Sequence, residues 1–498
     1  MIAWDDSAAA QRRWLLGAAG CAIALGVLFR VLASTRMDLF ADGVEYVEMG
    51  HSWSRWHDFL LPDGERMGRT LHLGPGYSHH FPPAYPFALG LIFSAIGFGV
   101  TQAKAAIVAL SLAALGAVYA TTRNLFGAER ALLVASLVAL DPGLVWVTGI
   151  GLSENFSLLF ATLTVWAFLR SLTDLRYILP TGVFWTAVYL ARSSAGVFGL
   201  APAIAGAWWW WKFRGWRVLL SPWCIAAGTI FAAAVLLWGW RNYSLFGDSA
   251  TSPYMSAAYD WGLTQPALVA KALLGKGAFF GALLLAYALP FWPELRASLR
   301  RLREAETSIL WLFVGVIWGL AWCVTSAFWP YEQKSFFSLD HQRYILIGVV
   351  PLLWLVVRNA EPVGMLLRRW AILAAVLLLA SSAVLLNPMR RSSARAAEFV
   401  DPYLRDGDTV ILKGSIHKYD LDAHFSRIDP ITVRTQPGER LPEFAFLGDV
   451  PPEPMPDGYD LVGTFEQGGR FPSVTYVIAP VPIIQERELP TDVTEIYD

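Results

Sequence analysis

Charged residues are scarce in this sequence. Lys, Arg, Asp and Glu make up 16% of its 498 residues, against about 25% in an ordinary soluble protein. Apolar residues supply 55% and gather in runs of membrane-span length or nearly so, such as LFVGVIWGLAWCV and WAILAAVLLLASSAVLL. We therefore predict a polytopic α-helical membrane protein.

Cysteine and net charge are also low. The three cysteines, Cys21, Cys224 and Cys323, all lie inside apolar runs, which excludes a disulfide framework and a thiolate metal site. A net charge of −1 argues against a nucleic-acid partner. The first apolar run, Trp14 to Ala33, has no small-residue cleavage site, so we predict a retained helix and not a signal peptide.

The number of spans depends on one short segment. Residues 84–99 are bounded by prolines and glycines and are shorter than the roughly 20 residues that a span needs. Apolar segments are found at 13–35, 84–99, 103–122, 130–148, 155–170, 176–190, 194–211, 218–240, 268–293, 308–328, 342–357 and 367–387.

The distribution of basic residues decides whether 84–99 crosses. If it does not, every short basic loop falls on the side of the N-terminus, where the positive-inside rule expects it. Those loops carry Arg12, Arg13, Arg123, Arg130, Arg170, Arg176, Lys212, Arg214, Arg217, Arg296, Arg300, Arg301, Arg303, Arg358, Arg368 and Arg369. We therefore predict eleven spans, a cytoplasmic N-terminus, and 84–99 as a juxtamembrane or re-entrant helix.

This topology divides the chain in two. Residues 1–388 form the transmembrane unit, with 36–102 as its first external loop, and the tail, 389–498, lies outside. DTVILKG, YDLVGTF and VTYVIAPV read as short strands after a helix-like SSARAAEFVDPYL, so we predict a small extracytoplasmic α/β domain. All eight histidines fall in the predicted outside segments.

The stretch FADGVEYVEMG places carboxylates just after the first span. Asp42 and Glu45 are three residues apart and Tyr46 follows, so on a helical turn all three share one face. A carboxylate costs about 2.5–3.5 kcal/mol at the bilayer centre and much less in a wet cavity at its edge. The alternative to a built site is a solvated loop with ordinary acids.

The segment GPGYSHHFPPAYP favours a built site. Pro82 and Pro83 stiffen a chain that also carries His79, His80 and Tyr85. Adjacent histidines point different ways, and no i, i+4 pair supports a ligand set, so the spacing does not favour a metal.

Further ionisable residues stand at the outer ends of later spans. For any single cation the alternative is snorkelling to lipid headgroups, but several at one depth favour an anion such as phosphate. These residues are Glu154, Arg192, Arg241, Lys334 and Arg343. An acid beside a cationic cradle suits transfer from a phosphate-linked donor, in which the carboxylate takes a proton from an acceptor hydroxyl.

Six motifs in this order resemble the GT-C glycosyltransferases, in the branch of the protein O-mannosyltransferases and the aminoarabinose transferase of lipid A. They are DGVEY, HFPPAYP, SENFSLLF, ARSSAG, RNYSLFGD and RYILIGVVPLL, within about residues 30–390. The resemblance implies a bacterial inner-membrane enzyme with the GT-C fold. It would transfer a sugar, with inversion, from a polyprenyl-phosphate carrier to a glycan, lipid or protein acceptor on the outer face.

The resemblance also implies roles for individual residues. Asp42 corresponds to the catalytic base, and Arg343 to the arginine that holds the lipid phosphate. Arg192, Arg241, Lys334 and His80 are further candidate phosphate ligands. Glu45 is a candidate catalytic residue, and Tyr46, His79, Pro82, Pro83, Tyr85 and Glu154 are candidate wall residues.

In one position the sequence departs from the family pattern. Many relatives carry adjacent acids, whereas here Gly43 follows Asp42 and the next acid is Glu45. The role of Glu45, orienting the acceptor or simply solvated, is therefore open. Because relatives differ in metal use, we expect no cofactor and no metal for catalysis.

Two other functions compete with this one. A lipid-linked-sugar flippase would use the same lipid, but such transporters often show inverted repeats, and the sequence has no internal repeat. A glycan ligase or O-acyltransferase would also act at the outer face; for the acyltransferase we would expect a histidine-centred site in place of an Asp-led first loop.

Overall fold

A computed structural model describes most of the chain. The residues described are 3–39, 41–57, 59, 81–192, 200–246, 286–328, 346–360, 363–386, 392–405, 408, 410–414, 444–448, 455–467, 473–491 and 493–497. All structural statements below concern these residues.

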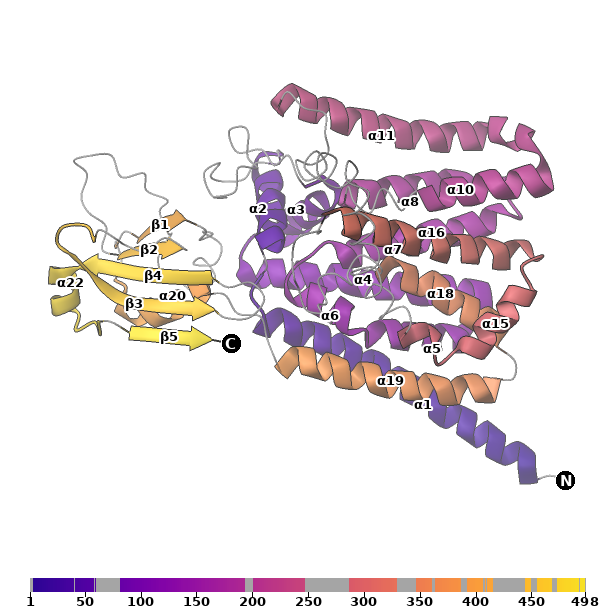
Figure 1. The fold of residues 1–498 in the computed structure, drawn as a ribbon, viewed down its shortest axis with the longest axis horizontal. Coiled ribbons are helices and arrows are strands. Elements are labelled where there is room, and N and C mark those ends of the chain that lie inside the picture. Colours follow the sequence, from indigo (N-terminus) through magenta and orange to yellow (C-terminus); the bar gives the residue numbers. More distant parts are fainter. Residues whose placement is uncertain are drawn as a thin grey trace.

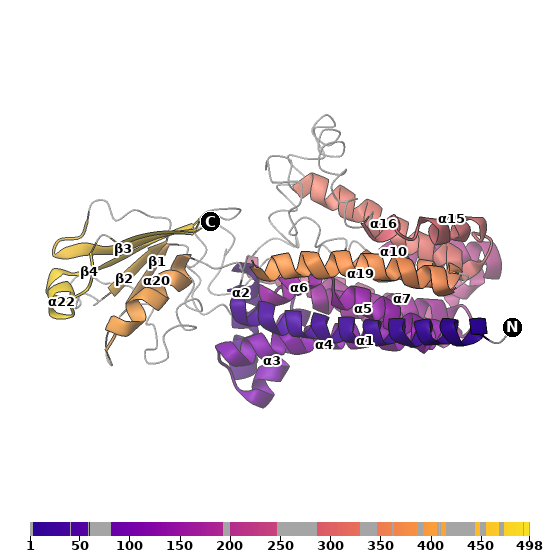
Figure 2. The same cartoon turned by 90° about the horizontal axis from the view of Figure 1, so that it is seen from below.

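A bundle of long helices forms the larger part of the molecule, and a small sheet stands at one end of it (Figures 1 and 2). The helices of the bundle are α1 (Ala3–Arg36), α2 (Ala41–Trp56), α3 (Ala84–Ile96), α4 (Val100–Phe126), α5 (Ala128–Ala139), α6 (Pro142–Gly149), α7 (Glu154–Ser171), α8 (Ile178–Ala191), α10 (Leu200–Trp209), α11 (Pro222–Phe246), α15 (Trp292–Arg300), α16 (Ala305–Phe328), α18 (Leu346–Asn359) and α19 (Val363–Leu386). Apart from α2 and α3, these helices pack around one large apolar core.

Four described helices are long and apolar enough to cross a membrane, within α1, α4, α11 and α19. α5 and α6 together pass the same test as a span broken by a 55° bend. This confirms a membrane protein with several apolar spans, whereas the count of eleven stays a prediction. The segment 130–148, which we expected to be one helix, is interrupted because Pro142 starts a new helix capped by Asp141 Oδ1, which accepts from Leu144 N at 2.9 Å.

The doubtful segment 84–99 forms α3, which has only 13 residues and lies beside α2 at the sheet end of the bundle (Figure 1). Glycines let the two helices approach closely, since a Cβ on Gly90 would lie 2.8 Å from Gly50 O. α2, α3 and the start of α4 share a separate apolar core. This arrangement agrees with a helix that does not cross.

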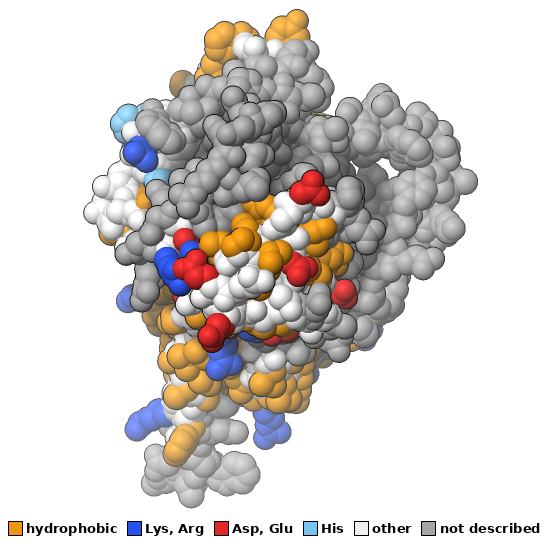
Figure 3. All heavy atoms as spheres, turned by 90° about the vertical axis from the view of Figure 1, so that its left-hand side faces the viewer, with side chains coloured by type: hydrophobic (Ala, Val, Ile, Leu, Met, Phe, Trp, Pro, Cys, Tyr) orange, Lys and Arg blue, Asp and Glu red, His pale blue; other side chains and the backbone are white. Residues whose placement is uncertain are grey.

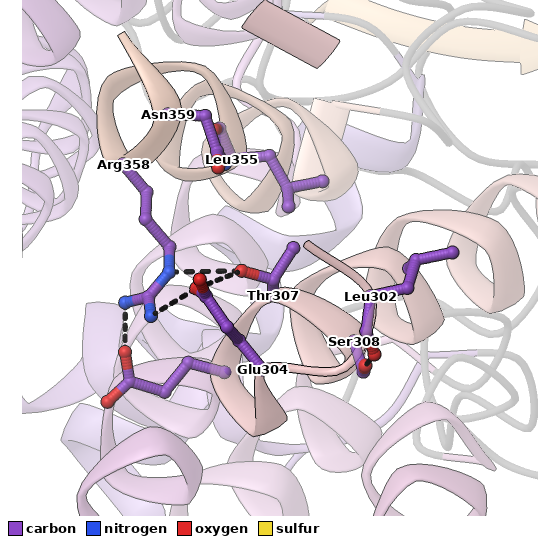
Figure 4. Close-up of polar contacts among 8 residues, drawn as sticks. Leu302, Glu304, Thr307, Ser308, Leu355, Arg358 and Asn359 are labelled. Carbon is purple, nitrogen blue, oxygen red and sulfur yellow. Dashed lines mark hydrogen bonds and ion pairs between the residues drawn. The ribbon is translucent and has the colours of Figure 1, made fainter. Parts of the chain in front are cut away.

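At the opposite end of the bundle, Arg358 joins α18 to the α15–α16 turn (Figure 4). Its Nε donates to Thr307 Oγ1 at 3.1 Å, and its Nη2 donates to Glu304 Oε2 at 3.2 Å. Its Nη1 donates to Glu306 Oε2. A cation at the carboxyl end of one helix and acids near the amino end of another suit both helix dipoles. This cluster lies far from α2, at the basic end of the bundle (Figure 1).

The tail contains a five-stranded mixed sheet, which confirms the small C-terminal α/β unit. Its order is β1-β2-β4-β3-β5, formed by β1 (Val410–Gly414), β2 (Phe444–Gly448), β3 (Tyr459–Gln467), β4 (Ser473–Pro480) and β5 (Val493–Tyr497). β1–β2 and β3–β5 are parallel and the other pairs antiparallel. α20 (Ser392–Val400) packs Ala396, Ala397 and Val400 onto one face. The domain boundary at 388/389 stays a prediction.

A buried ion pair closes this unit next to α22 (Val481–Glu486). Arg487 Nη2 donates to Asp408 Oδ1 and Nη1 donates to Tyr403 O, both at 2.8 Å, and both side chains of the pair are 7% exposed. Elsewhere the described surface of the unit mixes acidic and apolar side chains (Figure 3). Burial by itself raises the pKa of Asp408, but hydrogen bonds from Arg487 and from the Arg405 N–H outweigh it and hold that pKa below its ordinary value.

We expect Arg487→Met to lower the free energy of unfolding of this unit by about 3 kcal/mol at neutral pH, because it leaves a buried carboxylate without its partner. When folding lowers the pKa of a carboxylate, the carboxylate stabilises the folded protein at any pH above its pKa in the unfolded chain, about 3.9. This stabilisation is lost as the pH falls through the pKa in the folded protein. The variant should therefore also lose the acid dependence of the wild type below about pH 4.

Hydrogen exchange of peptides from β2, β3 and β4 in the full-length protein measures both effects. Glu486→Gln is the matched control, because its partner Arg405 is 55% exposed and such surface pairs contribute little. Equal loss of protection in the two variants would contradict a stabilising role for the buried pair of Arg487 and Asp408.

Candidate active site

The first two turns of α2 carry the predicted acids. Asp42 is partly exposed, whereas Glu45 is 3% exposed. Burial, followed by the nearby carboxylates of Asp42 and Glu48, raises the pKa of Glu45 well above its ordinary value. In the described part of the chain no donor reaches Glu45 Oε1. The two acids therefore differ in kind: Asp42 can meet solvent and substrate, and Glu45 favours its neutral form.

Aromatic side chains surround Tyr46 behind these acids. The Tyr46 ring centroid lies 4.7 Å from that of Phe81 and 5.1 Å from that of Tyr85. Tyr85 in turn packs 5.5 Å from Phe156 on α7. Pro82 is buried and Pro83 directly precedes α3, so Phe81 and Tyr85 of the FPPAY segment lie against Tyr46, and the role of the prolines as wall residues stays a prediction.

An ion pair links the ends of α7 and α8 beside this wall. Arg192 Nη1 binds Glu154 Oε1, and both side chains are largely buried. Burial raises the pKa of the Tyr46 hydroxyl; Arg192 opposes that shift, and Asp42 and Glu154 add to it. Arg192, Asp42 and Glu154 are therefore each close enough to act on Tyr46, and the structure groups Asp42, Glu45, Tyr85, Glu154 and Arg192 around it.

The loop between α6 and α7 fixes α2 from behind. Tyr85 OH donates to Gly151 O at 3.3 Å, and Ser153 Oγ donates to Tyr46 OH at 3.3 Å. A Cβ on Gly43 would lie 2.3 Å from Ile150 O. This contact gives a physical reason why glycine, and not a second acid, follows Asp42.

The remaining predicted residues are not brought into this cluster by described contacts. Arg241 at the end of α11 donates to Asn242 Oδ1 at 2.9 Å and lies 4.6 Å from the ring of Trp238, both in its own helix. His79, His80, Lys334 and Arg343 lie outside the described residues. Their part in phosphate binding stays a prediction.

Sequence reasoning missed the residues that support the site by shape. Gly43 lets the backbone of α2 come close to Ile150, and Gly151 has a φ of +79°. Ser153 contacts Tyr46, and Phe156 contacts Tyr85. Only the positions of the neighbouring helices make these residues significant. Among the described residues no three His, Cys, Asp or Glu side chains gather as a metal site, and the expectation of metal-free catalysis stays a prediction.

We expect Glu45→Gln to keep turnover within about tenfold of wild type, because Glu45 is buried whereas Asp42 is accessible to an acceptor hydroxyl. When folding raises the pKa of a carboxyl group, the protein loses stability as the pH rises. For a glutamate the loss begins near the pKa in the unfolded chain, about 4.3, and is complete above the pKa in the folded protein. The variant should therefore be the more stable protein at pH 8 and nearly equal to wild type at pH 4. Thermal unfolding at the two pH values, with turnover, tests this; a loss beyond 100-fold would instead make Glu45 the base.

Comparison with known proteins places this site in a recognised fold. Residues 80–240 match the family model of dolichyl-phosphate-mannose-protein mannosyltransferase. The crystal structure of ArnT from Cupriavidus metallidurans bound to undecaprenyl phosphate is similar over 93% of this chain and 98% of that one, with a TM-score of 0.57 and 12% identity. No curated protein sequence matches.

An archaeal enzyme shares the same fold. The Archaeoglobus fulgidus oligosaccharyltransferase AglB, in complex with an inhibitory peptide and a dolichol-phosphate, is similar over 85% of this chain and 65% of that one, with a TM-score of 0.50 and 13% identity. An Archaeoglobus fulgidus oligosaccharyltransferase in complex with Zn and sulfate has a TM-score of 0.51 and 12% identity, over 83% of this chain and 62% of that one. The matches confirm the GT-C fold and indicate a glycosyltransferase.

Proposed function

We propose that this glycosyltransferase moves a sugar from a polyprenyl-phosphate carrier to a hydroxyl acceptor, with inversion, at the outer face of a bacterial inner membrane. The observation that supports this most is the group of Asp42, Glu45, Tyr46 and Arg192 at one end of the bundle. The fold is also that of proteins solved with undecaprenyl phosphate or dolichol-phosphate. The basic turns lie at the other end, which suits a cytoplasmic N-terminus and a periplasmic tail.

In this mechanism Asp42 is the general base, because it is the accessible acid of the pair. Its carboxylate takes the proton of the acceptor hydroxyl, whose oxygen attacks the anomeric carbon opposite the phosphate. The bond from that carbon to the phosphate oxygen breaks, and its electron pair leaves with the polyprenyl phosphate. Cations stabilise the departing charge, and no covalent intermediate is formed.

The cations proposed for the phosphate are Arg343, Lys334, Arg241, Arg192 and His80. Arg192 is already held by Glu154. A guanidinium has five N–H donors, so it can bind one phosphate oxygen while keeping this partner. In this proposal the pair shapes the site and the other cations supply most of the positive charge.

Incubating the purified protein with a set of polyprenyl-phosphate sugars and candidate acceptors tests the proposal. We expect acceptor-dependent release of free polyprenyl phosphate in equal amount with the new glycoside. In sealed vesicles a flippase would instead move the intact lipid-linked sugar across the bilayer without consuming it, and that result would replace transfer by transport.

A further inference from the structure

The break between α5 and α6 creates a problem inside the bundle. Where a helix stops, its last carbonyls lose their helical donors, and a membrane interior has no water to replace them. The carbonyls at this break belong to Val138, Ala139 and Leu140. α6 then leaves at 55° to α5 and leads directly into the loop behind Asp42.

Arg30, in the last third of α1, supplies donors to two of these carbonyls. Nη2 donates to Val138 O at 3.0 Å, and Nη1 donates both to Ala139 O and, at 3.0 Å, to Gly26 O of its own helix. A Cβ on Gly26 would lie 2.4 Å from Ala139 O, so glycine is needed for this approach. Ser381 Oγ satisfies Leu140 O at 2.6 Å.

A buried carboxyl group lies at the same break. Asp141 caps α6 and also accepts a hydrogen bond from Tyr287 OH at 2.6 Å. Arg30, Asp141 and Tyr287 are each at most 1% exposed. A charge buried in a bundle needs hydrogen-bond partners for its polar atoms, and the guanidinium of Arg30 donates to four oxygens here.

A line of hydrogen bonds runs from Arg30 to the active-site helix α7. Nε of Arg30 donates to Ser111 Oγ on α4 at 2.9 Å, which leaves the Ser111 hydroxyl to donate to Thr148 Oγ1 on α6 at 3.1 Å. Thr148 also accepts from Asn155 Nδ2 at 2.8 Å and donates to Leu144 O at 2.7 Å. Every donor and acceptor direction in this line is consistent.

The far end of the line touches the site. Asn155 follows Glu154, the partner of Arg192. Thr148 lies near the end of α6, directly before the loop that meets Gly43, Tyr46 and Tyr85. The line therefore joins the helix break to the support of Asp42 without any member reaching the acids themselves.

We propose that Arg30, Ser111, Thr148 and Asn155 are positioning residues for transfer, which set the α6–α7 loop and through it the place of Asp42 on α2. This inference rests on the proposed function. A merely structural network would change stability alone, whereas a positioning network changes turnover beyond its effect on stability. Displacements of about 1 Å from the reactive geometry can cost on the order of 100-fold in rate.

Thr148→Val tests the proposal, because it keeps the shape of the side chain and removes the hydroxyl at the centre of the line. The matched control is Thr122→Val, since Thr122 is also fully buried and accepts from Trp354 Nε1 at 2.8 Å, away from the site. We expect similar losses in thermal midpoint but a fall in kcat of about ten- to a hundredfold only for Thr148→Val. KM for the donor should stay within about twofold, and Thr148→Ser, which restores the hydroxyl, should recover kcat.

Hydrogen exchange of residues 149–156 gives a readout that does not need activity. We expect faster exchange there in Thr148→Val and not in Thr122→Val. Equal kcat losses in the two valine variants, or unchanged exchange in Thr148→Val, would overturn the positioning role. If the wild type transfers no sugar, the proposed function fails and with it the role in transfer, and loop exchange then decides only whether Thr148 holds the α6–α7 loop.

Discussion

Asp42→Asn is expected to lower transfer by about 100-fold or more, the range of general base catalysis, while the protein remains folded and binds the lipid phosphate. The amide matches the carboxylate in shape but cannot accept the proton of the hydroxyl. Asp42 is partly exposed at the start of α2, so little desolvation accompanies the change. The rate of transfer and the affinity for the lipid phosphate, both measured on the purified variant, test this expectation.

Two controls make this result specific. Glu45→Gln removes the neighbouring acid and is expected to keep most of the activity, which separates the base from the local negative charge. Arg358→Lys alters the polar cluster at the far end of α18 and should leave transfer unchanged. Near wild-type turnover in Asp42→Asn would remove Asp42 from the mechanism.

Gly43→Ala is expected to have the second large effect, from a single added methyl group. Its Cβ would stand 2.3 Å from Ile150 O and 3.3 Å from the backbone of Gly151, so α2 or the loop must move. Overpacking of this kind costs about 1–3 kcal/mol, and the shift it forces falls on the base at the adjacent position. We expect a lower thermal midpoint and at least a tenfold loss of kcat.

Gly116→Ala is the matched control for this substitution. Gly116 also lies within a helix, α4, but nothing lies within 4 Å of an added Cβ. Alanine there should stabilise the helix by about 0.5–1 kcal/mol and leave turnover unchanged. Unaltered activity in Gly43→Ala would show that the contact with the 150–151 loop does not hold the base.

Sequence patterns identified the parts of the fold that depend on local composition. The long apolar runs form α1, α4, α11 and α19, and the proline-bounded run forms the short helix α3. In the tail, the strand signals at β1, β3 and β4 were correct, and β2 and β5 were missed. β2 is a five-residue strand paired in parallel with β1, and β5 pairs in parallel with β3, so both depend on crossovers that leave little local trace.

The candidate site was predictable only in part. Asp42, Glu45 and Tyr46 share a helical turn, so their proximity follows from spacing. The sequence marked Gly43 only as a departure from the family pattern and did not mark Arg30. Their importance arises where α2 meets the α6–α7 loop and where α1 meets the break after α5. The Asp-Pro pair that starts α6 was a local signal for that break, but the surrounding apolar run concealed it.

Thiol labelling of Asp42→Cys in intact cells tests most directly whether the outer end of the bundle holds the lipid-phosphate site. The three native cysteines, Cys21, Cys224 and Cys323, are first replaced by alanine. We expect a membrane-impermeant maleimide to label the new thiol from outside and added polyprenyl phosphate to protect it. Labelling that needs permeabilised cells, or that the lipid does not change, would contradict this account.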